Sequence, residues 1–212
     1  MLRSGLHINM LLGRMMNMSL GNRIAIVGNA GGGKTTLARE LGRILDLPVT
    51  HVDSIQYRSG WRRTPDEECD GKLTEIASKD CWIIDGFGNN NVIENRIETA
   101  DTVLFVDFPI WRHYWWAFRR QLAARKGQRK ELPADCPEFT LTYTKKLIKV
   151  MWLVHKEYTP WFRKLVSAKS KTGNVVVLKN PNEIDRFIRN VEKESKLHLN
   201  KGLQRTCLPA GR

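Results

Sequence analysis

The chain has 212 residues, 42% of them hydrophobic, and a formal net charge of +13 at pH 7. This length supplies one α/β domain with a substantial core, and no stretch approaches the roughly 18 consecutive apolar residues that a membrane span requires. The four cysteines lack the Cys-x-x-Cys spacing of zinc sites and do not suggest a disulfide framework, so we expect reduced cysteines and a cytoplasmic protein.

The positive charge is concentrated in one segment. Residues 111–171 contain 15 Lys/Arg and 4 Asp/Glu, whereas residues 1–110 contain 12 and 14. Such a segment attracts partners that carry phosphate, and charge alone does not distinguish a nucleotide from a nucleic acid.

The N-terminal residues 1–17 are not predicted to belong to the domain. Arg14 interrupts their apolar run, and no small-residue cleavage site follows, so we do not expect a signal peptide. We expect a disordered extension or a mis-assigned start, because Met18 leads directly into the first predicted strand. The single domain is then expected to span residues 18–196.

The first predicted strand, residues 23–27, leads into a glycine-rich turn and an amphipathic helix over residues 34–46. The turn fits the phosphate-binding pattern G-x-x-x-x-G-K-[ST], whereas the spacing G-x-G-x-x-G of a dinucleotide-binding turn is missing. Backbone N–H groups and the positive helix end in such a turn bind phosphate oxygens. We therefore predict an ATP site rather than a purely structural turn, formed by Gly28, Asn29, Ala30, Gly31, Gly32, Gly33, Lys34, Thr35 and Thr36. Lys34 is expected at the β and γ phosphates and Thr35 at Mg²⁺.

Two further predicted strands end in a carboxylate. Residues 49–52 lead to Asp53, and residues 81–84 lead to Asp85. The ligand crevice of an open parallel sheet lies outside the carboxyl ends of its strands, so both side chains should reach it. We expect Asp85 to hold Mg²⁺ together with Thr35, as a Walker B carboxylate does. Asp53 could bind the acceptor, accept its proton, help to hold Mg²⁺, or merely cap a helix or turn.

An insertion over about residues 54–80, with a helix at residues 66–79, is predicted to bind the phosphate acceptor. It contains Trp61 and three arginines, and Arg96 follows the third strand. We expect acceptor contacts from Asp53, Arg58, Trp61 and Arg96, with one or two of the arginines binding an anionic group.

Strands at residues 102–106 and 174–178 alternate with helices at residues 110–126, 139–155, 158–168 and 182–196, which predicts a parallel sheet. Trp111, Trp115, Phe118 and Leu122 recur at helical spacing and are expected in the core, as is Trp152. Residues 197–212 have no periodic apolar face and are predicted to be a flexible tail.

A short lid is expected over about residues 119–137. Phosphoryl transfer depends mainly on positioning and charge stabilisation, for which arginine is suited. We expect Arg119 and Arg120, near Arg125 and Arg129, to swing over the phosphates; the alternative is a solvated basic face.

Together these motifs resemble the adenylate kinase-like P-loop kinases, most closely the bacterial topology modulation proteins. The matching pieces include the glycine-rich turn, His51-Val-Asp53, Gly60-Trp61, Trp82-Ile-Ile-Asp85-Gly86, Asp107-Phe-Pro109 and Arg119-Arg120. The resemblance implies an α/β fold of three α/β/α layers, the P-loop NTPase fold, with a five-stranded parallel sheet in the order 2-3-1-4-5. It also implies a short lid and ATP as the phosphate donor.

The resemblance departs at the acceptor site. Adenylate kinases carry Asp-Gly-Phe-Pro-Arg after the third strand, whereas this chain has Asp85-Gly86-Phe87-Gly88-Asn89 and lacks the arginine. Kinases of the shikimate and gluconate type share a short lid and an aspartate at the position of Asp53, which keeps a non-nucleotide acceptor open.

We therefore expect a kinase that transfers the γ-phosphoryl group of Mg-ATP to a nucleoside monophosphate or nucleoside. Its expected catalytic residues are Lys34, Asp53, Asp85, Arg119 and Arg120. The alternatives are a small-metabolite kinase of the shikimate or gluconate type, a nucleotide-binding regulator of DNA topology, and a simple NTPase. We expect a small-molecule acceptor as partner, no membrane, and a monomer or weak dimer; nucleic acid is possible but not favoured.

Overall fold

The computed structural model describes residues 20–124, residues 141–200 and Cys207. A parallel sheet of five strands lies at its centre, in the order β2-β5-β1-β6-β7. The strands are β1 (Arg23–Gly28), β2 (Val49–His51), β5 (Trp82–Asp85), β6 (Thr102–Val106) and β7 (Asn174–Leu178). Numbered among themselves along the chain, these strands have the predicted order 2-3-1-4-5.

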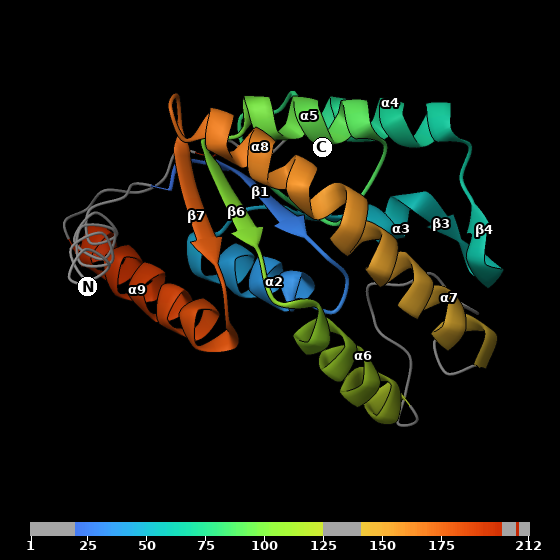
Figure 1. Cartoon of the computed structure of the whole chain (residues 1–212). Helices are drawn as coiled ribbons and strands as arrows, with labels where there is room; N and C mark the ends of the chain where they lie inside the picture. The colour runs from blue at the N-terminus through green and yellow to red at the C-terminus, as the bar shows by residue number, and fades with distance from the viewer. Residues whose placement is uncertain (1–19, 125–140, 201–206, 208–212) are drawn as a thin grey trace.

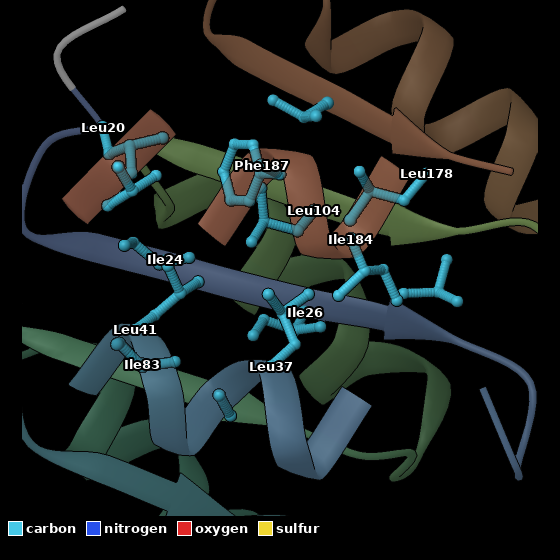
Figure 2. Close-up of a cluster of buried hydrophobic side chains, with 14 of the residues drawn as sticks. Leu20, Ile24, Ile26, Leu37, Leu41, Ile83, Leu104, Leu178, Ile184 and Phe187 are labelled. Atoms are coloured by element: carbon cyan, nitrogen blue, oxygen red, sulfur yellow. The ribbon is translucent and has the colours of Figure 1, made fainter. Parts of the chain in front are cut away.

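Helices cover both faces of the sheet, so the three-layer arrangement is confirmed (Figure 1). One face carries α2 (Lys34–Leu45) and α9 (Pro181–Asn200), and the other carries α4 (Asp66–Ala77), α5 (Asn90–Thr99) and α8 (Thr159–Lys169). Strand β1 is buried on both faces because it is the central strand: Ile24 and Ile26 pack on the α2 and α9 side (Figure 2), and Ala25 and Val27 on the other.

The register of the strands brings the carboxyl ends of β1, β2 and β5 to the same edge of the sheet. Asp85 of β5 lies opposite His51 of β2 and opposite Ile26 of β1, and Gly28 of β1 lies opposite Val106 of β6. The glycine-rich turn and the end of β5 therefore open at the same edge of the sheet.

The predicted insertion contains a small antiparallel hairpin that the sequence pattern did not predict. Helix α3 (Val52–Gln56) is followed by β3 (Tyr57–Arg58), the turn η2 (Ser59–Trp61) and β4 (Arg62–Arg63). At the tip, Trp61 adopts a φ of 58°, and its ring lies edge-on to that of Tyr57, with centroids 5.2 Å apart. Strands of two residues are too short to show a period in the sequence.

Helix α6 (Ile110–Ala124) follows β6, and the chain resumes in α7 (Leu141–Leu153) and the π-helical turn η3 (Val154–Tyr158). Most of the predicted lid, including Arg125 and Arg129, lies outside the described residues.

The prediction that the aromatic stripe of α6 belongs to the core is wrong. Trp111, Trp115 and Phe118 are 59%, 54% and 55% exposed, and Trp152 of α7 is 55% exposed. The opposite face of α6 is buried instead, through His113 and Ala117. The helix has aromatic residues on both faces, so periodicity alone does not identify the packed one. The side chain of Leu122 lies outside the described residues.

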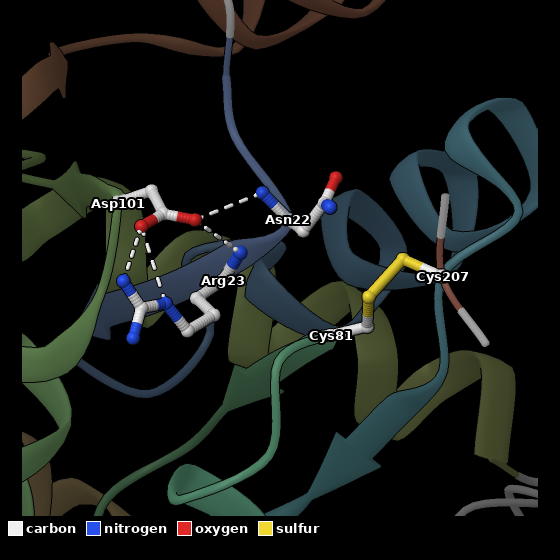
Figure 3. Close-up of a disulfide and its surroundings, with 5 residues drawn as sticks. All are labelled: Asn22, Arg23, Cys81, Asp101 and Cys207. Carbon is white, nitrogen blue, oxygen red and sulfur yellow. Dashed lines mark hydrogen bonds and ion pairs between the residues drawn. A yellow bond between two sulfur atoms is a disulfide. The ribbon is translucent and has the colours of Figure 1, made fainter. Parts of the chain in front are cut away.

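The cysteine prediction also fails, because Cys81 and Cys207 form a disulfide (Figure 3). It joins two residues 126 positions apart, one directly before β5 and one in the predicted tail. Helix α9 moreover runs to Asn200, past the predicted domain end at residue 196. Cys69 is a free, buried cysteine.

The extension at residues 1–17 lies outside the described residues. None of the helices in the described part of the chain has the length and apolar character needed to cross a bilayer.

Candidate active site

The glycine-rich turn joins β1 to α2, and its shape is maintained by hydrogen bonds to its polar side chains. Lys34 Nζ donates to the Asn29 carbonyl oxygen over 2.8 Å. The buried Asn29 side chain donates to the Met151 carbonyl oxygen over 2.8 Å and accepts from the Ala30 N–H. The turn is therefore attached to α7 as well as to its own helix.

Gly33, the residue before α2, is required by geometry. Its φ is 80°, in the left-handed region, and a Cβ there would lie 2.8 Å from Cζ3 of the Trp116 ring. Only glycine fits both constraints without strain. Backbone N–H groups at the start of a helix, approached without Cβ atoms, suit a polyphosphate.

A hydroxyl, a carboxylate and an imidazole meet at the carboxyl ends of β2 and β5. Thr35 Oγ1 donates to Asp85 Oδ2 over 3.0 Å, and His51 Nδ1 is hydrogen-bonded to Asp85 Oδ1. Asp85 is 3% exposed, so both partners are needed to compensate its burial. The structure thus brings together the two residues predicted to hold the metal.

His51 was not predicted as a site residue. The available signal was its position two residues before Asp53, at the end of the second strand. Its ring fixes the orientation of the Asp85 carboxylate.

The donors of this cluster fit Mg²⁺, which takes oxygen ligands and keeps several waters when it binds together with phosphates. In the described residues no group of three or more His, Cys, Asp or Glu side chains could form a metal cage by itself. Thr35 and Asp85 match an ion that is shared with a bound nucleotide.

His113 of α6 lies against the turn. A Cβ at Gly32 would be 3.1 Å from its Cε1 atom. Burial, together with the nearby charge of Lys34, lowers the pKa of His113 to about 4. The imidazole is therefore neutral at pH 7 and adds no charge beside the glycine-rich turn.

A groove of about 570 Å³ lies beside the carboxyl ends of β2 and β5. Phe87 lines it two residues after Asp85, and Gln56 lines it from α3, the short helix that also carries Asp53. The groove is further lined by Arg63, Asp66, Asp70, Gly88, Asn89, Asn90, Asn91 and Tyr158. Asp53 lies close enough to Tyr57 that its charge, after burial, raises the pKa of the phenol.

The arginines predicted to bind the acceptor are occupied elsewhere. Arg58 pairs with Glu68 on the surface. Arg96 is 1% exposed and donates to the Gly86 carbonyl oxygen over 2.9 Å, so it supports the turn after β5 and does not line the groove. Burial lowers the pKa of Arg96 to about 10. The predicted acceptor contact of Arg96 is thus replaced by a structural one.

The structure does not test the positions predicted for the two lid arginines. Arg119 is exposed on α6, and the side chain of Arg120 lies outside the described residues. Their catalytic role stays a prediction.

The sequence matches no protein-family model and no curated protein. Its structure, however, is similar to solved structures. Shikimate kinase from Acinetobacter baumannii, solved with shikimate, superimposes with a TM-score of 0.54 at 16% identity, covering 87% of this chain and 96% of that one. Shikimate kinase from Bacteroides thetaiotaomicron gives 0.51 at 17% identity, covering 82% and 98%. A gluconokinase from Sinorhizobium meliloti 1021 gives only 0.46 at 11% identity, covering 88% and 99%, which is too distant to support an inference. At these identities the likeness establishes a shared fold.

Proposed function

We propose that the protein is a small-metabolite kinase, which transfers the γ-phosphoryl group of Mg-ATP to a hydroxyl group of its acceptor. The observation that carries the proposal is the hydrogen bond of 3.0 Å between Thr35 Oγ1 and Asp85 Oδ2, which joins the glycine-rich turn to the end of β5. A turn that only connected a strand to a helix would not require a buried carboxylate at this hydroxyl.

The type of acceptor is suggested by the groove and by the solved structures of similar fold, two of which are shikimate kinases. A nucleoside monophosphate would need cations for its phosphate. Two of the three arginines in the insertion, Arg58 and Arg63, are paired with Glu68 and Asp66, and the third, Arg62, is exposed and does not line the groove. A metabolite acceptor is therefore better supported than a nucleoside monophosphate.

In the proposed mechanism, the N–H groups of the turn and Lys34 bind the phosphate oxygens of ATP. Thr35 and Asp85, which are hydrogen-bonded to each other, would hold Mg²⁺, and the ion would supply positive charge to the phosphates; His51 keeps the Asp85 carboxylate oriented. Asp53 accepts the proton of the acceptor hydroxyl while that oxygen bonds to the γ-phosphorus and the bond to the β–γ bridging oxygen breaks. The products are ADP and the phosphorylated acceptor.

The test is phosphoryl transfer by the full chain to a panel of hydroxylated metabolites and nucleosides, followed by ³¹P NMR. We expect at least one phosphorylated product, with the rate reduced about 100-fold or more in Lys34→Met. The matched control is Lys164→Met, on the exposed surface of α8.

A second variant, Asp53→Asn, should lower kcat more than it changes KM, because it removes the proton acceptor and retains the shape. Steady ATP hydrolysis that no panel member accelerates would identify a simple NTPase and overturn the proposal.

A further inference from the structure

The groove has the dimensions and position of an acceptor site. Its volume of about 570 Å³ is in the range of sites for small molecules. Asp53 does not itself line the groove, but Gln56, which does, lies three residues after it on the same face of α3. Phe87 places the groove next to the end of β5, where Asp85 contacts Thr35.

The charged side chains that line this groove sum to a negative formal charge. They are one cation, Arg63, and two carboxylates, Asp66 and Asp70. Arg63 Nη2 donates to Asp66 Oδ1 over 3.1 Å, so its charge is already matched. Asp70 then remains as the unbalanced charge of the lining.

Arginines near the groove do not change this balance. Arg58 is paired with Glu68, which also accepts from Lys72 over 2.8 Å. Arg96 is buried and donates to the Gly86 carbonyl oxygen. Arg62 is exposed and donates to the Ser59 carbonyl oxygen over 3.3 Å. None of these three arginines belongs to the lining.

The N-terminal end of α5, where the helix dipole is positive, already has a carboxylate beside it. Both oxygens of Asp70 accept from Asn89 Nδ2, over 3.0 and 2.9 Å, and Asn89 is the residue directly before α5. An anion at this helix end would therefore meet Asp70, and like charges at short distance repel.

The remaining polar lining consists of amides and a phenol, from Gln56, Asn89, Asn90, Asn91 and Tyr158. These groups donate and accept hydrogen bonds without carrying charge, and carboxylates accept from hydroxyl groups. The lining thus complements several hydroxyl groups better than a carboxylate or a phosphate.

We infer that the groove binds an electrically neutral, hydroxyl-rich acceptor, and that Asp66 and Asp70 discriminate against anionic relatives of that acceptor. The inference rests on the proposed kinase function. One hydroxyl group of the acceptor gives its proton to Asp53 as its oxygen takes the γ-phosphoryl group, and ADP leaves.

The experiment compares compounds that differ in charge, in protein saturated with Mg-ADP so that the phosphate site is filled. The probes are D-glucose against D-gluconate, adenosine against AMP, and myo-inositol against shikimate, with binding measured by ligand-observed NMR and calorimetry. The wild-type protein should bind at least one neutral probe, and about 10-fold more tightly than its anionic counterpart.

The variant Asp66→Asn/Asp70→Asn keeps the shape of the lining and removes two negative charges. It should raise the affinity for the anionic probes about 10-fold. The control Glu75→Gln/Asp80→Asn changes the net charge equally at exposed positions outside the groove, and should leave these affinities unchanged.

Any one of three results would overturn the inference. The wild-type protein could prefer an anionic probe, the Asp66/Asp70 variant could show an unchanged affinity for anions, or no neutral probe could bind. Because binding is measured without phosphoryl transfer, failure of the kinase proposal is recognised separately, by absence of a phosphorylated product in the transfer assay.

Discussion

Protonation of His113 should destabilise the fold and can be measured without knowledge of any substrate. The ring is 1% exposed beside the glycine-rich turn, and its Nδ1 atom has no hydrogen-bond partner among the described residues. Burial and the charge of Lys34 lower its pKa to about 4, from 6.5 in an unfolded chain. The unfolded state therefore binds a proton more readily than the folded state.

The sign and the size of the effect follow from these two pKa values. Above pH 6.5 the ring is neutral in both states and does not change the free energy of unfolding. As the pH falls from 6.5 to 4, only the unfolded state gains the proton, so the free energy of unfolding decreases. The difference corresponds to a total loss of about 3 kcal/mol, of which about 2 kcal/mol is reached at pH 5.

Urea unfolding at pH 7.5, 6.0 and 5.0 measures this loss. The variant His113→Gln should remove the contribution of His113, so that its free energy of unfolding falls by about 2 kcal/mol less than that of wild type between pH 7.5 and 5.0. His198→Gln, at an exposed position of α9, is the matched control and should behave as wild type. Equal pH dependence in wild type and His113→Gln would refute the reasoning.

Three further predictions concern stability and the glycine-rich turn. Reduction of the Cys81–Cys207 disulfide should lower the free energy of unfolding by up to about 5 kcal/mol, because it opens a loop of 126 residues. In the variant Cys207→Ser, unfolding should not respond to reductant. Phe162→Ala should cost about 3–5 kcal/mol in thermal or urea unfolding, since its fully buried ring packs against Phe87 and Phe105; a cost below 1 kcal/mol would contradict this packing. Gly33→Ala should weaken ATP binding measured by calorimetry, because a side chain at a φ of 80° introduces about 1–3 kcal/mol of strain. Gly71→Ala is the control and should leave ATP binding unchanged, because no atom lies within 4 Å of the new Cβ.

The strand–turn–helix unit around the glycine-rich turn was predictable because its parts are contiguous in the sequence. Strand, glycine-rich turn and helix occupy residues 23–45, and a turn of this type needs its glycines at fixed places. Asp85 could also be located, since an apolar run that ends in a carboxylate delivers it to the ligand edge of a parallel sheet. Local pattern and tertiary position agree for these residues.

Features that depend on distant partners were not predictable in the same way. The buried face of α6 is decided by its contact with the glycine-rich turn, about 80 residues earlier, through His113 and Trp116. The disulfide joins Cys81 to Cys207 across 126 positions, which no spacing pattern indicates. Helix α5 was missed because its polar start, Asn89-Asn90-Asn91, resembles a loop.

The groove beside β5 shows why a count of arginines in the sequence is a poor guide to local charge. The chain carries a net charge of +13, and three arginines follow Asp53 within ten residues. Helix α4, however, begins with Asp66, Glu67 and Glu68 and carries Asp70 one turn further on. Two of these carboxylates, Asp66 and Glu68, pair with the hairpin arginines. Pairing of Arg58 and Arg63 with α4 leaves amides, a phenol and one unbalanced carboxylate in the groove. A strongly basic chain thus contains a groove whose lining is not basic, in which the two aspartates outnumber the single arginine.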